Sequence, residues 1–89
     1  MVHVQVRGIE CDFDETAVND FRMMGLLTRM KRNEQDYEAS WDFVCRFFGE
    51  EQLERILDEL EDTSTQSVLR FIQEATEEAA KVKGEDSKN

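Results

Sequence analysis

The segment from residue 36 to residue 48 predicts a helix that is apolar on two sides. At about 100° per residue, one apolar stripe forms along it, made of Tyr37, Trp41, Val44, Cys45 and Phe48. Phe43 and Phe47 point roughly opposite that stripe. We expect the stripe to face the core. The opposite pair leaves two alternatives open: the helix is central and covered all round, or one side binds another protein.

The N-terminal stretch alternates apolar and polar side chains, which is typical of a half-buried strand pair. A two-residue turn at Arg7 and Gly8 brings one set of side chains to a single face: Val2, Val4, Val6, Ile9, Cys11 and Phe13. Arg7 is a poor residue for the positive φ that such a turn requires. Because a lone hairpin is marginally stable in water, we expect residues 2–13 to pack on a helix.

Three further helices are predicted at about residues 15–32, 50–60 and 65–83. Asp14 is the expected N-cap of the first, and Gly49 is expected to end the helix at 36–48. Residues 84–89 contain no apolar side chain and predict a disordered tail. The predicted fold is therefore α+β, mainly α: one domain over residues 1–83, with an N-terminal β-hairpin packed on a bundle of about four helices.

The first of these helices carries two apolar stripes. One consists of Val18, Phe21, Met24 and Gly25, and the other of Met23, Leu26, Leu27 and Met30. Methionines at such positions form either an adaptable binding surface or ordinary core. We take Phe43, Phe47, Met23 and Met24 as the candidate partner-binding residues, and expect at least one phenylalanine and one methionine of this set to be partly exposed.

The charge of the chain excludes several classes of partner. The 89 residues carry a formal net charge of −10. Nucleic acids and anionic membranes bind through basic side chains, so neither is an expected partner. The remaining interpretations of the charge are solubility, mimicry of nucleic acid, or covering a basic surface on another protein. No stretch approaches the length of a membrane-spanning helix, and no signal peptide is evident.

The residues that usually carry chemistry form no convincing site. His3 is the only histidine, and we expect it on the polar face of the hairpin. Cys11 and Cys45 lack the spacing of a zinc or redox pair, and free thiols are typical of a reducing compartment. Asp12 and Asp14 resemble the start of a calcium loop, but Ala17 stands where that loop requires glycine. The sequence predicts no enzyme, no metal and no cofactor.

The order of these segments resembles the tail assembly chaperones of long-tailed bacteriophages and prophages. The motifs that carry the resemblance are IECDFD at 9–14, VNDFRMMGLL at 18–27 and FFGEEQLERILDEL at 47–60. The stretch from Gly49 to Leu53 is similar to the GEEQ(Y/W)E motif of that family. Two departures are Arg7-Gly8, where Asp-Gly or Asn-Gly is common, and Leu53, where an aromatic residue is common.

The resemblance implies a non-enzymatic protein in the cytoplasm of the bacterial host. Its expected partners are the tape measure protein and the tail tube subunit, and a homo-oligomer is left open. The resemblance also implies absence from the finished virion. Two other functions remain as alternatives: an acidic interaction protein such as an antitoxin, anti-repressor or nucleic-acid mimic, and an adaptor or structural subunit.

Overall fold

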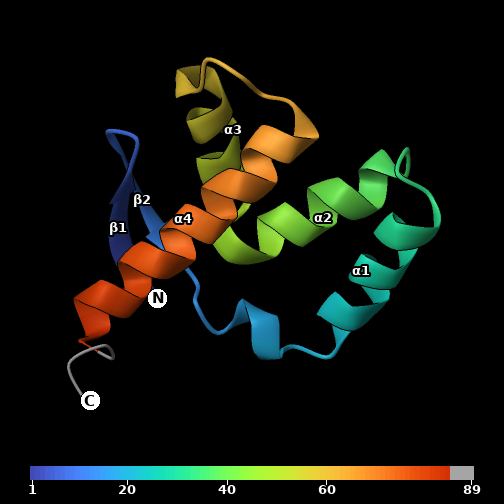
Figure 1. The fold of residues 1–89 in the computed structure, drawn as a ribbon, viewed down its shortest axis with the longest axis horizontal. Coiled ribbons are helices and arrows are strands. Elements are labelled where there is room, and N and C mark those ends of the chain that lie inside the picture. The colour runs from blue at the N-terminus through green and yellow to red at the C-terminus, as the bar shows by residue number, and fades with distance from the viewer. Residues whose placement is uncertain (85–89) are drawn as a thin grey trace.

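The computed structural model describes residues 1–84 as a β-hairpin and four α-helices around one core (Figure 1). The elements are β1 (Val2–Val6), β2 (Ile9–Phe13), a 3-10 turn η1 (Ala17–Asn19), α1 (Arg22–Arg32), α2 (Tyr37–Phe48), α3 (Glu50–Glu59) and α4 (Thr65–Lys83). The predicted α+β, mainly α fold class is confirmed. The tail predicted at 84–89 lies outside the described residues, apart from Gly84, which ends α4 with a φ of 71°.

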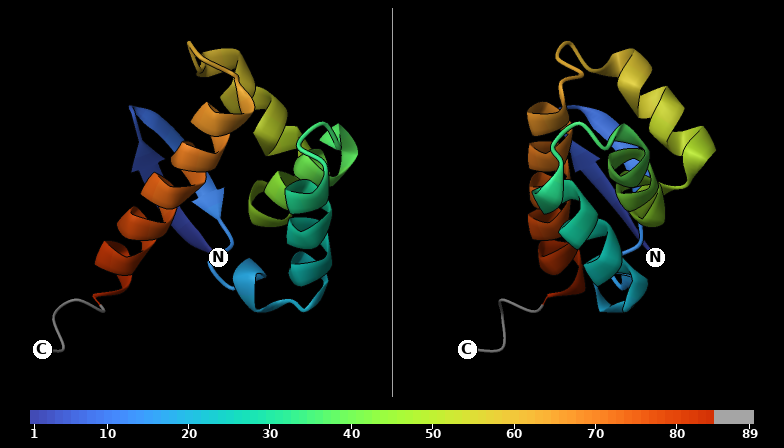
Figure 2. Two further views of the ribbon diagram at one scale, coloured as in Figure 1. Left: turned by 45° about the vertical axis from the view of Figure 1, so that its right-hand side comes forward. Right: turned by 90° about the vertical axis from the view of Figure 1, so that its right-hand side faces the viewer.

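The hairpin has the predicted register, and its apolar face packs on α4. Antiparallel pairing joins Val2 to Phe13, Val4 to Cys11 and Val6 to Ile9, and all six side chains are buried. Figure 2 shows α4 crossing this face of the two strands. A continuous apolar face on a short hairpin thus obtains the helical cover that it needs to be stable.

The hairpin turn has an uncommon residue for a structural reason. Arg7 has a φ of 53° and Gly8 a φ of 79°, so a non-glycine residue occupies the left-handed region. The Arg7 guanidinium donates through Nε and Nη2 to the Glu74 carboxylate at 3.0 Å each. It also lies 5.7 Å from the centroid of the Phe71 ring. These contacts with α4 offset the unfavourable backbone geometry and fix the hairpin on the helix.

The first helix is shorter than predicted. Asp14 does not cap it, because its carboxylate accepts hydrogen bonds from the backbone and hydroxyl of Thr16 at 3.0 and 2.6 Å. Asp20 then has extended backbone, with φ −77° and ψ 121°. Its carboxylate accepts from the Arg22 backbone at 2.9 Å, where α1 begins. Two short polar side chains thus compete with the backbone and divide the expected helix 15–32 into η1 and α1.

The other helix boundaries lie close to those predicted. The Asp36 carboxylate accepts from the Ala39 backbone at 3.0 Å and caps α2. Gly49, with a φ of 82°, separates α2 from α3, a conformation that favours glycine. The Ser64 hydroxyl accepts from the Ser67 backbone at 3.3 Å at the start of α4. Gly49 thus ends α2 as predicted, and Asp36 and Ser64 cap helices whose starts were predicted near residues 36 and 65.

An aromatic cluster at the centre of the core decides which side of α2 is buried. Phe47 is only 2% exposed and stacks on Phe13, with ring centroids 5.3 Å apart and an interplanar angle of 2°. Phe43 meets Phe47 edge-on at 5.4 Å. Phe48 contacts both Phe13 and Phe71. The hairpin and α4 therefore cover the side of α2 that carries Phe47, and the central-helix alternative is correct for that residue.

On the opposite side of α2, the exposure of two residues differs from the sequence prediction. Tyr37 is 65% exposed and Trp41 is 37% exposed, although both were expected to face the core. Val44 and Phe48 of the same stripe are buried as expected. Helical periodicity identifies both apolar sides of a helix but carries no information on which distant element will cover each one. Here, Phe13 from the hairpin takes the side that was assigned to a partner.

The free edge of β2 is capped by side chains from α3. The Gln52 amide accepts from the Asp12 backbone N–H at 2.6 Å and donates to the Asp12 carbonyl at 2.8 Å. It also donates to the Phe48 carbonyl at 2.8 Å. Arg55 donates to the Glu10 carbonyl at 2.7 Å. These bonds satisfy backbone groups that an exposed sheet edge would otherwise offer to another chain.

Replacing Gln52 with alanine is expected to lower the free energy of unfolding by about 1–3 kcal/mol, because several backbone groups of the hairpin and α2 lose their partner. Urea denaturation followed by circular dichroism measures this change. The matched control is Gln66→Ala on the exposed side of α4, which should change stability by less than about 0.5 kcal/mol. Equal stabilities for the two variants would contradict this role of Gln52.

Candidate functional site

The structure divides the four candidate partner-binding residues between core and surface. Phe47 and Met23 are buried, so they are not accessible to a partner in this conformation. Phe43 is half-buried at the edge of the core, and Met24 is exposed. One phenylalanine and one methionine of the set thus remain accessible, as expected. The structure corrects the choice of Phe47 and Met23 as accessible binding residues. The hairpin and α2 cover these two side chains, as a partner was expected to do.

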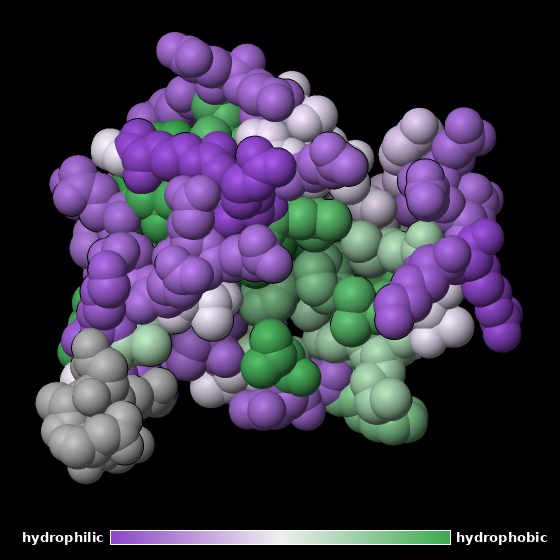
Figure 3. Space-filling model, in the orientation of Figure 1, coloured by the Kyte–Doolittle hydropathy of each residue, from purple (hydrophilic) through white to green (hydrophobic). Residues whose placement is uncertain are grey.

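An apolar strip runs along η1 and α1 on the surface of the protein. Its members are Val18, Phe21, Met24 and Leu27, each exposed and three positions from the next. Phe21, which is 80% exposed, is the only phenylalanine that does not belong to the core or its edge. Figure 3 shows apolar surface gathered in the hollow between α4 and α1 and continuing toward the start of α1. Contiguous exposed apolar surface of this kind marks interaction sites.

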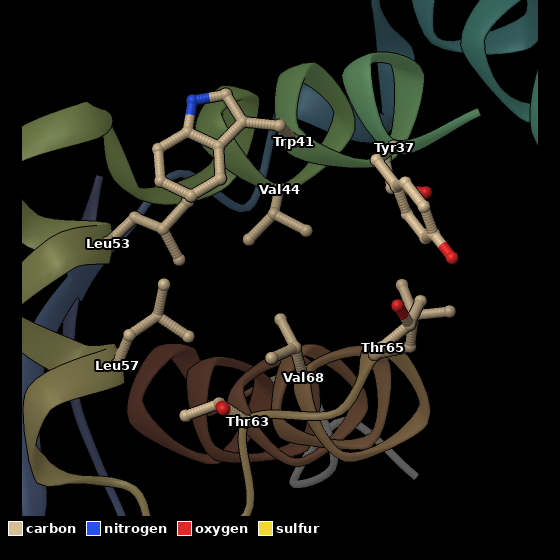
Figure 4. Close-up of a pocket in the computed structure, with 10 residues that line it drawn as sticks. Tyr37, Trp41, Val44, Leu53, Leu57, Thr63, Thr65 and Val68 are labelled. Atoms are coloured by element: carbon tan, nitrogen blue, oxygen red, sulfur yellow. The ribbon is translucent and has the colours of Figure 1, made fainter. Parts of the chain in front are cut away.

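A second apolar surface is a groove between α2, α3 and α4. Its lining residues are Tyr37, Ser40, Trp41, Val44, Leu53, Leu57, Thr63, Thr65, Val68 and Leu69. Figure 4 shows Val44, Leu53, Leu57 and Val68 directed into the opening from three different helices. Val44 and Leu53 are buried and form the floor, whereas Tyr37 and Trp41 form an exposed wall. We call this feature the apolar groove.

The sequence contained a signal for this groove that the prediction did not use. Tyrosine and tryptophan combine an apolar ring with a polar group, so they suit positions that are partly covered and partly in water. Both aromatic residues with such a group, Tyr37 and Trp41, lie on the same side of α2. Phe43 and Phe47, which lack a polar group, lie on the other. Side-chain chemistry therefore indicates which side of α2 is buried more deeply.

Acidic side chains lie close to Cys45 and beside the α3 wall of the apolar groove. Asp42, Glu50 and Glu54 are exposed, and all three act on Cys45, which adjoins the groove residue Val44. The pKa of the Cys45 thiol is raised, first by burial and then by the negative charge of these three carboxylates. None of the groove-lining residues is basic. The groove is therefore apolar inside, and Glu50 and Glu54, three residues before Leu53 and Leu57 on α3, place negative charge beside one of its walls.

The charge of α1 is the opposite of the charge around the groove. The helix contains Arg22, Arg29, Lys31 and Arg32 and no acidic residue. Two of its arginines are held by neighbouring carboxylates. Arg22 donates to Asp20 at 2.7 Å, and Arg29 donates to Asp36 at 3.1 Å. The protein thus presents two apolar surfaces with different electrostatic surroundings.

Within residues 1–84, the side chains that could bind a metal do not assemble into a metal site. Cys11 is buried in the hairpin, and burial raises the pKa of its thiol to about 11, which leaves it protonated and unreactive. Among the described residues, no group of three or more His, Cys, Asp or Glu side chains is arranged to hold a metal ion. The acidic residues of α3 therefore do not form the magnesium cluster that their number alone would suggest.

His3 lies on the polar face of the hairpin, as predicted. Its Nδ1 is 3.0 Å from an Asp12 oxygen, and its Nε2 is 3.0 Å from a Glu10 oxygen. Hydrogen bonds to these two carboxylates raise the pKa of the imidazole above 6.5. The pair of carboxylates stabilises the charged form, which is a structural role for an exposed histidine.

The protonation of His3 is expected to stabilise the fold at acidic pH. Because its pKa is higher in the folded state, this contribution is present below pH 6.5 and is lost as the pH rises through the raised value. An NMR titration of the single imidazole should give a pKa above 6.5, and Asp12→Asn should lower it. A pKa at or below 6.5 in the unmodified protein would contradict the two hydrogen bonds.

Comparisons with known proteins add no identification. No helix in the described part of the chain combines the length and apolarity needed to cross a bilayer. No family model, curated protein or solved structure matches this chain.

Proposed function

We propose that this protein is a non-enzymatic tail assembly chaperone of a long-tailed phage or prophage, acting in the cytoplasm of the bacterial host. It binds the tape measure protein, the tail tube subunit, or both, before the tube polymerises. The observation that carries the proposal is the amount of apolar surface left exposed on a small acidic protein, in the apolar strip and the apolar groove.

The physical argument rests on the cost of exposed apolar surface. An 89-residue chain has a small core, and leaving Phe21, Met24 and Trp41 in water sacrifices part of its hydrophobic stabilisation. Covering those side chains with the apolar stripes of a partner removes surface from water on both molecules. The net charge of −10 would then keep the complex dispersed. This combination suits a protein that protects long apolar helices before assembly.

An acidic interaction protein such as an antitoxin, anti-repressor or nucleic-acid mimic is the second candidate. The observation that favours it is the exposed acidic side of α3, with Glu50, Glu51, Glu54 and Asp58. Such a mimic binds its basic target through carboxylates, whereas a chaperone binds through the apolar surfaces. Strong dependence of binding on salt, combined with no effect of Phe21→Asp, would favour this candidate.

Co-expression with the tape measure protein and the tail tube subunit of the same phage genome tests the proposed function. We expect the tape measure protein to become soluble and to co-purify with this chain on a tag carried by the chain. An unrelated acidic protein of similar size serves as the control for the effect of charge alone. Neither partner co-purifying, with the tape measure protein insoluble in both cases, would contradict the proposal.

A further inference from the structure

We propose that the apolar groove binds a helix of another protein whose apolar stripe is flanked by lysine or arginine side chains. The inference rests on the proposed function for the source of that helix, which would be a segment of the tape measure protein. It adds the binding site on this chain and the chemical character of the segment.

The shape of the groove suits large side chains of a helix. Walls from α2, α3 and α4 enclose it on three sides (Figure 4). Its volume is about 200 Å³, below the ~300–1,000 Å³ typical of small-molecule sites. The floor formed by Val44 and Leu53 is apolar, and the polar lining groups are the indole N–H of Trp41 and the hydroxyls of Tyr37, Ser40, Thr63 and Thr65. One or two apolar anchors at i and i+3 or i+4 of a bound helix would fill such a space.

The charge around the groove determines which helix fits. On α3, Glu50 and Glu54 are three residues before the groove residues Leu53 and Leu57, so they lie beside them on the helix surface. The single basic residue of α2, Arg46, lies 3.8 Å from Asp20 and is paired there. A helix entering the groove thus meets the carboxylates of Glu50 and Glu54 on the α3 side, which favours lysine or arginine beside its apolar anchors.

A second copy of this chain is a weaker occupant. Among the helices of residues 1–84, α1 alone is both apolar and basic, and its Arg22 and Arg29 are already paired with Asp20 and Asp36. The binding site would therefore gain two free charges, from Lys31 and Arg32, instead of four. Each copy also carries a net charge of −10, which opposes self-association at low salt. A basic helix from another protein meets neither obstacle.

Two synthetic peptides test the proposal. Both are 20-residue helices with the same leucine stripe, flanked by lysine in one and by glutamate in the other. Trp41 is the only tryptophan and lies in the groove wall, so its fluorescence reports binding directly. We expect the lysine peptide to shift the Trp41 emission to shorter wavelength and to bind at least about tenfold more tightly than the glutamate peptide. Equal affinities, or no spectral change with either peptide, would overturn the proposal.

A matched pair of charge reversals locates the site. Glu54→Lys, at the border of the groove, should weaken binding of the lysine peptide by at least about fivefold. Glu77→Lys makes the same change on an exposed part of α4 more than two turns from the groove residue Val68 and should leave binding unchanged. Equal effects of the two variants would mean that overall charge, and not the groove border, governs binding. That outcome would also overturn the proposal.

Sedimentation experiments distinguish a second copy of this chain in the groove from the proposed helix of another protein. Self-association that rises with protein concentration, is abolished by Glu54→Lys and is displaced by the lysine peptide would assign the groove to a second copy. The proposed function has its own test in co-purification with the tape measure protein. If that protein co-purifies equally with the unmodified chain and with Glu54→Lys, the chaperone function stands and the groove inference fails.

Discussion

Replacing Phe47 with aspartate is expected to unfold the protein. The side chain is 2% exposed and stacks on Phe13 at the centre of the aromatic cluster. The substitution removes this packing and buries a carboxylate with no cationic partner. The combined loss exceeds about 4 kcal/mol, which is a large share of the roughly 5–15 kcal/mol that stabilises a typical domain. Far-UV circular dichroism should show loss of most helical signal at 25 °C.

The matched control for this experiment is Phe21→Asp. The residue types are the same, but Phe21 is 80% exposed, so the new carboxylate stays in water. Its free energy of unfolding should change by less than about 0.5 kcal/mol. A folded Phe47→Asp variant with a cooperative thermal transition would contradict the arrangement of the core described above and would restore the alternative in which that side of α2 binds a partner.

Phe21→Asp is also expected to weaken binding to the partner by at least about tenfold while leaving the protein folded. A large aromatic side chain at the centre of an apolar strip is the kind of residue that dominates binding energy in interfaces. A carboxylate in its place would have to be desolvated when the partner binds. The co-purified complex is separated into its two proteins, and these are refolded. Isothermal titration calorimetry of the partner with each variant then measures the change in affinity.

A conservative variant distinguishes lost apolar contact from added charge. Phe21→Leu keeps an apolar side chain and should retain most of the affinity. Gln35→Asp places the same charge at an exposed position in the connection between α1 and α2, outside the strip, and should have little effect. If Phe21→Asp binds as tightly as the unmodified protein, the strip is not part of the interface, and partner binding would then depend on the groove alone.

Local sequence chemistry was sufficient for the elements themselves. The register of the hairpin follows from alternation and a two-residue turn, and the structure has the predicted pairs. The starts of α2 and α4 follow from Asp36 and the short polar turn before Thr65. Both signals act between residues close in the chain, which is why a single sequence reveals them.

The first helix shows where local rules conflict. Asp14, Thr16 and Asp20 can each cap a helix or interrupt one, because a short polar side chain competes for nearby backbone N–H groups. The sequence alone gave Asp14 as the cap, whereas the structure uses Asp20 at the start of α1. The Asp20 carboxylate also lies 3.8 Å from Arg46 on α2. This long-range contact helps to hold Asp20 in place at the start of α1.

The sequence by itself determined that α2 is apolar on two sides and that the protein is acidic. Only the tertiary structure decided which side is buried. Phe13 from the hairpin packs on Phe47 and Phe48, and Phe71 from α4 packs on Phe48; both are more than 20 residues away from these α2 phenylalanines in the chain. Burial of an apolar side chain depends on which elements meet it in space, and the hydrophobic effect has no direction along the sequence. Tyr37 and Trp41, in the first half of the other stripe, were left exposed, and there they form the wall of the groove.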